Sequence, residues 1–206
     1  MKYMVALAVS LLPSLALAAS VGPVYKINSG GERAGVLSIS NDGPSRVYQI
    51  TVDQMVVEGG IAVRKPSSNI RFAPSVIRVE KGAQQSVRYI KGPDSTGSEE
   101  FYRVSVTELA EPGETGMIKL VKQDLAWIWR APNAQPLLSA KWEGEALVVT
   151  NTGTASARLV SPQSGATTRP GLLGYVLPGE TRRFSLPGFS HGPVSFDVNG
   201  KRQVVQ

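Results

Sequence analysis

Short apolar runs separated by glycine, proline and polar residues make up most of this chain of 206 residues. No long segment repeats with the period of 3.6 residues that an amphipathic helix needs. The runs are rich in Val, Ile, Tyr and Phe, and the whole sequence holds 21 glycines and 14 prolines to turn the chain between them. Strands of this length and spacing are typical of β-sandwiches. The sequence therefore predicts an all-β fold, with strands near residues 35–40, 47–57, 61–63, 76–79, 86–90, 102–109, 117–129, 146–150, 156–160, 182–186 and 194–198.

A proline-rich segment divides the chain. Pro132 and Pro136 limit regular strand pairing and stiffen the backbone between them. We expect two immunoglobulin-like β-sandwich domains, residues 19–131 and residues 132–206, joined at an angle by a short linker.

The first 18 residues have the pattern of a secretory signal peptide. Lys2 gives a basic start, residues 5–17 are mostly apolar, and Ala16 and Ala18 form a small-x-small cleavage site before Ala19. The alternative is a membrane helix, which needs about 20 apolar residues and no cleavage site. We therefore expect residues 1–18 to be removed and the mature chain to leave the cytoplasm.

The composition excludes several classes of site. The chain has no cysteine, which rules out disulfides, thiol catalysis and cysteine metal sites. Its net charge is +6 at pH 7, but the basic residues are spread out rather than clustered as in nucleic-acid-binding proteins. A mildly basic surface suits an acidic partner or a carboxylate.

Residues 117–130 form the longest β-like run before the linker. Ile118 and Leu120 share one face of such a strand, whereas Met117, Val121 and Leu125 share the other. One interpretation is a central or bent strand of the domain's own sheets. The other is an edge strand that pairs with a second protein chain, so that alternate side chains fill a groove in the partner.

Motifs within residues 72–109 are more specific than the strand pattern. In order, they are Phe72 with Pro74, a turn at Gly82, Gln85 with Arg88, Glu100 with Arg103 and Val104, and Glu108 with Leu109. This order resembles the N-terminal domain of the periplasmic pilus (fimbrial) assembly chaperones of the chaperone–usher pathway. Residues 22–27 and 36–42 are similar to the first strands of the archaic branch of that family.

The resemblance implies a periplasmic chaperone that stabilises incomplete pilus subunits by donor-strand complementation and delivers them to an outer-membrane usher. Ile118, Leu120 and Lys122 would lie on the subunit-binding strand. From the single histidine, the absence of cysteine and the lack of phosphate, calcium or dinucleotide motifs, we expect no cofactor, metal, nucleic acid or small-molecule substrate. The unbound protein could self-associate through the exposed strand.

The resemblance also assigns basic residues to the subunit's terminal carboxylate. Lys26 matches the family's anchor on the first strand. Residues 126–129 have no lysine where well-known members carry a second anchor, so Arg88 or Lys122 is the expected substitute. Ordinary surface charges, or a structural salt bridge for Arg88, are the alternatives.

Three further charged residues match an interdomain network of the family. Arg130 would bond carboxylates from two separate strands, because one guanidinium can satisfy both. The expected members of this network are Glu99, Arg130 and Asp197, and the alternative is that all three are surface charges.

One enzyme signature occurs and is rejected. Residues 188–192 fit G-x-S-x-G, but no helix follows Ser190, and the only histidine of the chain, His191, is adjacent to that serine. We expect a polar loop and no catalytic residue. The rival to a chaperone is a structural or adhesive surface module, such as a pilus subunit or adhesin, for which we would expect a short N-terminal donor segment and a single incomplete domain.

Overall fold

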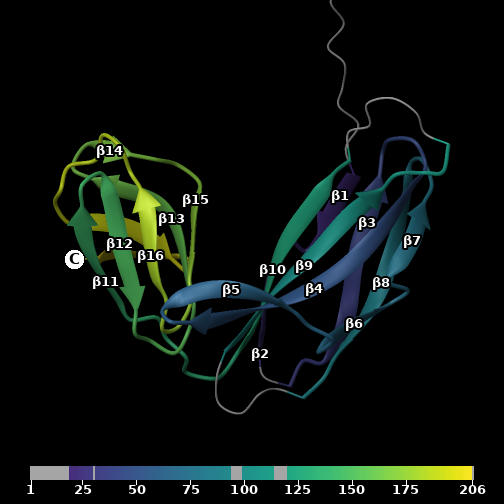
Figure 1. Ribbon diagram of the computed structural model, residues 1–206, viewed down its shortest axis with the longest axis horizontal. Helices are drawn as coiled ribbons and strands as arrows, with labels where there is room; N and C mark the ends of the chain where they lie inside the picture. Colours follow the sequence, from purple (N-terminus) through teal and green to yellow (C-terminus); the bar gives the residue numbers. More distant parts are fainter. Residues whose placement is uncertain (1–18, 30, 94–98, 114–119, 206) are drawn as a thin grey trace, which may run out of the picture.

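The computed structural model describes residues 19–29, 31–93, 99–113 and 120–205, and within these ranges every regular element is a β-strand. The strands form two sandwiches that stand at an angle to each other (Figure 1). In the described part of the chain no helix is long and apolar enough to cross a membrane. The predicted all-β fold of two joined immunoglobulin-like sandwiches is confirmed.

The first sandwich, called the first domain below, contains the strands up to β10. One sheet has the order β1-β3-β8-β6, and the other has the order β2-β10-β9-β4-β5 with β7 paired to β4. The bounds are β1 (Ala19–Gly22), β2 (Tyr25–Ser29), β3 (Ala34–Asn41), β4 (Arg46–Glu58), β5 (Ile61–Pro66), β6 (Ile70–Ala73), β7 (Val76–Val79), β8 (Ala83–Lys91), β9 (Glu100–Leu109) and β10 (Lys122–Arg130).

Aromatic side chains fill the core of the first domain. Tyr89, Tyr102, Trp127 and Trp129 lie between its two sheets, and each is 3% exposed or less. The rings of Tyr89 and Trp127 are 4.9 Å apart between centroids. Burial of such large apolar surfaces is the main stabilising contribution in a domain without disulfides.

The chain start serves both sheets of the first domain. Strand β1 pairs antiparallel with β3, the chain crosses at the cis peptide Gly22–Pro23, and β2 then pairs parallel with β10. The carbonyl of Pro23 accepts a hydrogen bond of 2.9 Å from Trp127 Nε1, which holds the crossing against the core. Residues 22–27, expected as one strand, are therefore divided between two sheets.

The second sandwich, called the second domain below, has sheets with the orders β11-β12-β16 and β14-β13-β17-β18, with β15 paired to β13. Its core is smaller and centres on Leu147, Leu159, Phe184 and Phe196. The bounds are β11 (Leu138–Glu143), β12 (Ala146–Asn151), β13 (Ala157–Ser164), β14 (Thr167–Thr168), β15 (Leu172–Val176), β16 (Thr181–Ser185), β17 (Val194–Val198) and β18 (Lys201–Val205).

A third apolar cluster joins the two domains. Phe101, Ala126 and Ile128 of the first domain pack against Tyr175 and Leu177 of the second. At the tip of the β4–β5 hairpin, the carbonyl of Gly60 accepts a hydrogen bond of 2.8 Å from the amide of Thr181. These contacts lie at the base of the angle seen in Figure 1, so the domains touch beyond the linker itself.

Candidate functional site

Successive side chains of β10 face two different environments. Leu125, Trp127 and Trp129 point into the first domain's core, whereas Ala126 and Ile128 lie on the opposite, outer face against the second domain. Nearer its start the outer face opens to solvent, because the side chain of Lys122 is exposed and nearby Leu120 is 44% exposed. The odd-numbered side chains of β10 from Leu125 onward therefore pack in the first domain's own core.

One edge of β10 is only partly covered. Strand β9 pairs with β10 along Lys122–Trp129, and on the other edge β2 covers only Ala126–Arg130. Within the described ranges, no strand pairs with the remaining edge at residues 122–125. This open edge is the place where another chain can add a strand.

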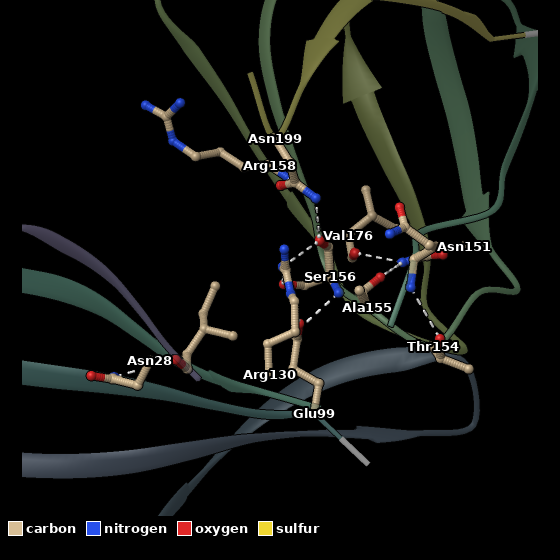
Figure 2. Close-up of polar contacts among 12 residues, drawn as sticks. Asn28, Glu99, Arg130, Asn151, Thr154, Ala155, Ser156, Arg158, Val176 and Asn199 are labelled. Carbon is tan, nitrogen blue, oxygen red and sulfur yellow. Dashed lines mark hydrogen bonds and ion pairs between the residues drawn. The ribbon is translucent and has the colours of Figure 1, made fainter. Parts of the chain in front are cut away.

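Near the linker, an ion pair of the first domain makes three hydrogen bonds to Ser156 of the second domain (Figure 2). Arg130 Nε lies 2.6 Å from Glu99 Oε2, and Glu99 Oε1 accepts a hydrogen bond of 2.8 Å from the amide of Ser156 in the second domain. Arg130 Nη2 donates to the carbonyl of Ser156 at 3.1 Å. The Glu99 side chain is only 1% exposed, so its charge depends on these partners.

Each domain also places an arginine over a tyrosine of the other. The guanidinium carbon of Arg103, on β9, lies 5.1 Å from the ring centroid of Tyr175, and that of Arg158, on β13, lies 5.2 Å from the ring of Tyr25. The two tyrosine rings are 6.1 Å apart. Burial lowers the pKa of Arg103 below that of an ordinary arginine, because desolvation disfavours its charge.

A carboxylate on β10 also faces outward. Asp124 pairs with Arg64 of β5 and accepts a hydrogen bond of 2.7 Å from Ser105 Oγ. Burial alone would raise the pKa of Asp124, but the hydrogen bonds from Arg64 and Ser105 outweigh it and hold the pKa below its usual value. Along the outer face of β10, Lys122 is exposed, Asp124 forms an ion pair, and Ala126 and Ile128 contact the second domain.

No family model and no curated protein matches this chain. Solved structures do. A chain of the CsuC–CsuE chaperone–tip adhesion subunit complex, from the archaic Csu pili of Acinetobacter baumannii, matches with a TM-score of 0.72 and 20% identity over 91% of this chain and 97% of that one. A chain of the Salmonella enterica SafA pilin–SafB chaperone complex gives a TM-score of 0.68 and 21% identity over 92% and 94%. The Escherichia coli chaperone DraB matches with a TM-score of 0.65 and 13% identity over 92% of this chain and 98% of DraB.

This chain has the pilus-chaperone fold. The matches span both domains and nearly the full length of each chaperone-like chain. The resemblance inferred from residues 72–109 is therefore supported at the level of the fold.

Within the pilus-chaperone fold, Lys26 points away from the outer face. Lys26 lies on β2, in register with Trp127 of β10. Its Nζ donates hydrogen bonds of 2.7 Å to Glu32 and 2.8 Å to the hydroxyl of Tyr89. Burial lowers its pKa, but the bonds to Glu32 and Tyr89 outweigh that effect and the net pKa is raised. Lys26 already has a carboxylate partner, and Tyr25 rather than Lys26 faces the second domain.

The other two expected anchors lie far apart in the fold. Arg88 is exposed on β8, in the sheet that does not contain β10, and it is paired in register with Val36 and Ala73. Lys122 is exposed at the start of β10, on the outer face and beside the open edge. Of the three expected anchors, Lys122 alone lies on β10.

The structure brings Glu99 and Arg130 together but leaves Asp197 elsewhere. Strand β17 pairs with β18 in a register that sets Asp197 opposite Arg202, and Asp197 Oδ1 is 3.5 Å from Arg202 Nη1. Arg130 instead bonds the backbone and hydroxyl of Ser156. A carboxylate on a loosely aligned strand could not be placed from sequence spacing, because register shifts along β13 move its neighbours.

Two features were not found from the sequence. Glu100 forms a buried ion pair with Lys91 at 2.5 Å, with side chains 3% and 0% exposed, and so links the two sheets. The sequence assigned no role to Arg103 or Arg158, whose guanidiniums each contact a tyrosine of the other domain. Arg103 belongs to the motif that begins at Glu100, but its contact with Tyr175 depends on how the two domains meet.

The residues of the G-x-S-x-G pattern lie in a loop before β17. Ser190 Oγ is 2.7 Å from Ser164 Oγ, and the ring of His191 stacks on Trp142 with centroids 5.1 Å apart. The strand that follows this loop is β17, so the strand-to-helix turn that exposes a nucleophile does not occur at Ser190.

Ile118 of the expected subunit-binding strand lies outside the described residues.

Proposed function

We propose that this protein is a periplasmic chaperone that captures incomplete pilus or fimbrial subunits through the open edge of β10 and delivers them to an outer-membrane usher. The observation that carries this proposal is the uncovered edge at residues 122–125 of a strand whose outer face turns toward solvent. In a chain with the pilus-chaperone fold, such an edge suits donation of a strand to a partner sheet.

Strand donation would combine two kinds of contact. Backbone amides and carbonyls of β10 at the open edge would pair with a strand of the subunit and supply sequence-independent affinity. Leu120, and Ile118 before it, would enter the subunit's groove and set the register, since burying one such side chain contributes about 1.5–3 kcal/mol. Lys122, on the same parity, would lie at the groove's end.

The chaperone role is favoured over a structural or adhesive surface module. Two domains are present, and the solved structures of similar fold include chaperones bound to a tip adhesion subunit and to a pilin. The proposed location follows from the leader-like residues 1–18 together with this role. We further propose that the protein acts by binding alone, without catalysis, cofactor or metal.

Co-expression with exported pilus subunits from the same gene neighbourhood tests the proposal. An affinity-tagged chaperone should recover one of them from periplasmic extract, and the subunit should be degraded when the chaperone is absent. Recovery should require an incomplete subunit, so a subunit supplied with its own donor strand at its terminus is the control. Equal recovery of the self-complemented subunit, or survival of the subunit without the chaperone, would reject strand donation.

A further inference from the structure

The sheet β1-β3-β8-β6 turns its outer face away from the second domain. The second domain contacts the other sheet of the first domain, through Phe101, Ala126 and Ile128. Figure 1 shows β8 on the far side of the first domain from that contact. The outer face of β1-β3-β8-β6 therefore takes no part in the domain contact or in the open edge of β10.

Arginine and aliphatic side chains lie together at one end of this outer face. Two neighbouring rows of exposed residues, in register across β3, β8 and β6, are Ala34–Ile90–Arg71 and Val36–Arg88–Ala73. Ile90 is 61% exposed and Val36 is 51% exposed. Arg33, also exposed, precedes β3 at the same end, where its carbonyl accepts a hydrogen bond of 2.8 Å from the amide of Lys91. The two rows together with Arg33 are called the basic face below.

The basic face carries positive charge without compensating acids. The four strands of its sheet contain no aspartate and no glutamate. Among the residues that the structure describes, the guanidiniums of Arg33, Arg71 and Arg88 have no hydrogen-bond or ion-pair partner. Glu32, the acid next to Arg33, is engaged by Lys26 at 2.7 Å. The three guanidiniums are therefore available to an external anion.

A polar hollow opens beside Arg71, where β6 begins. It has a volume of about 470 Å³ and is lined by Pro66, Ser67, Ser68, Asn69, Arg71 and Gly92. Hydroxyl groups donate hydrogen bonds to phosphate oxygens, and the planar fork of an arginine matches a phosphate with two parallel bonds. The volume suits a phosphate that carries a small polar group, whereas the carboxylate of an acidic side chain would fill only a small part of it.

We propose that the basic face docks on a membrane surface that contains anionic phospholipid. Arg33, Arg71 and Arg88 contact lipid phosphates, and one headgroup enters the hollow beside Arg71. Ile90 and Val36 reach into the interface between the headgroups, because shallow burial of aliphatic side chains adds to the electrostatic attraction of a membrane surface. In this orientation the open edge of β10, which lies in the other sheet, remains accessible. The inference does not depend on the proposed strand donation.

Vesicle flotation tests the basic face. The protein is the chain from Ala19 onward, so that the apolar leader adds no membrane affinity of its own. Vesicles of phosphatidylglycerol and phosphatidylcholine in equal parts should bind it at least about tenfold more strongly than vesicles of phosphatidylcholine alone. Arg71→Gln and Arg88→Gln should each lower binding to the anionic vesicles about fivefold, because one basic residue near such a surface contributes about that factor. High salt should shrink both effects. Ile90→Ser should also weaken binding, and its effect should persist in high salt, since apolar burial is not screened.

A matched control separates the basic face from the overall charge of the chain. Arg183→Gln removes the same charge from an exposed arginine on β16 of the second domain, whose side chain is 58% exposed, and should leave vesicle binding nearly unchanged. Soluble glycerol phosphate is the second probe. It should displace the protein from vesicles only weakly, because a membrane surface offers several phosphates at once. Circular dichroism establishes that each variant is folded.

Four outcomes would overturn the proposal. Equal binding to both kinds of vesicle, or binding to neither, rejects an anionic membrane as the partner. Binding that survives the double variant Arg71→Gln with Arg88→Gln rejects the assignment to the basic face. Full displacement by glycerol phosphate would mean that the hollow is a site for a soluble phosphate. Polyglutamate that binds through the same arginines, without any vesicle binding, would assign the face to an acidic protein.

Discussion

Arg130 Nε lies 2.6 Å from Glu99 Oε2, and through the other oxygen of the same carboxylate Glu99 holds the amide of Ser156 in the second domain. One carboxylate therefore joins the end of β10, the start of β9 and the residue that precedes β13 in the neighbouring sandwich. Because the Glu99 side chain is 1% exposed, its negative charge is compensated by protein groups rather than by water.

Substitution of either residue should destabilise the protein. Arg130→Ala leaves the buried carboxylate of Glu99 without its cation, and removal of one partner of a buried pair typically costs about 3–5 kcal/mol. Urea unfolding should show a clear loss for Arg130→Ala and for Glu99→Ala, with a less than additive loss for the double variant. Arg202→Ala is the matched control, because its ion pair with Asp197 is 39% and 45% exposed and should contribute little. Losses equal to that of the control would mean that Glu99 and Arg130 act as surface charges.

The ion pair between Lys91 and Glu100 gives a second prediction. With side chains 0% and 3% exposed, each buried charge has the other as an ion-pair partner across the two sheets of the first domain. Lys91→Met alone should therefore be strongly destabilising, by about 3–5 kcal/mol. The double variant Lys91→Met with Glu100→Leu should recover most of that loss, because a well-packed apolar pair often replaces a buried ion pair without penalty. Thermal unfolding measures both, and a double variant no more stable than the single one would contradict this account.

Local pattern predicted most of the fold. Apolar runs between turn residues predicted most of the longer strands, whereas β1, β11, β14, β15 and β18 lie outside the expected ranges. The two faces of β10 also follow from parity, with Leu125 inside and Leu120 exposed near its start. These features depend on near neighbours in the sequence, whose spacing alone sets which face a side chain occupies.

Features that depend on how separate segments meet could not be predicted. Lys26 was expected to anchor the subunit's carboxylate, but the crossing at Pro23 sets its parity so that Tyr25 faces the second domain instead. Asp197 was expected beside Arg130, and the register of β17 with β18 places it near Arg202. The contacts of Arg103 and Arg158 cross the domain boundary, and no local pattern encodes that approach.

Asp124 predicts a specific dependence of stability on pH. Hydrogen bonds from Arg64 and Ser105 hold its pKa below the ordinary value, so the ionised form is favoured in the folded protein. Such a group stabilises the fold above its unfolded pKa of about 3.9, and the contribution is lost as the pH falls through the folded pKa. Asp124→Asn should thus lower the free energy of unfolding at neutral pH by less than about 1 kcal/mol, because the pair is partly exposed. The difference should shrink toward pH 2–3. A difference that grows on acidification would contradict the predicted sign, and Asp197→Asn, with a more exposed carboxylate, serves as the control.

Leu120 and Leu125 lie on opposite parities of one strand region, and this makes them a matched pair for testing donation. Leu120 is 44% exposed, so Leu120→Ser should leave the unbound protein folded and its unfolding midpoint nearly unchanged. Leu125 is 1% exposed in the core, and Leu125→Ala should destabilise the first domain by about 2–5 kcal/mol.

If Leu120 fills a groove in the subunit, Leu120→Ser should weaken capture by about 1.5–3 kcal/mol. The double variant Leu120→Ser with Ile118→Ser should abolish recovery of the subunit. Circular dichroism and urea unfolding establish the folded state, and pull-down from periplasmic extract measures capture. A folded double variant that still recovers its subunit at the native level would show that this parity of the strand is not the donated face. Because Leu125 is buried in the domain's own core, it could not fill a subunit's groove without disrupting that core.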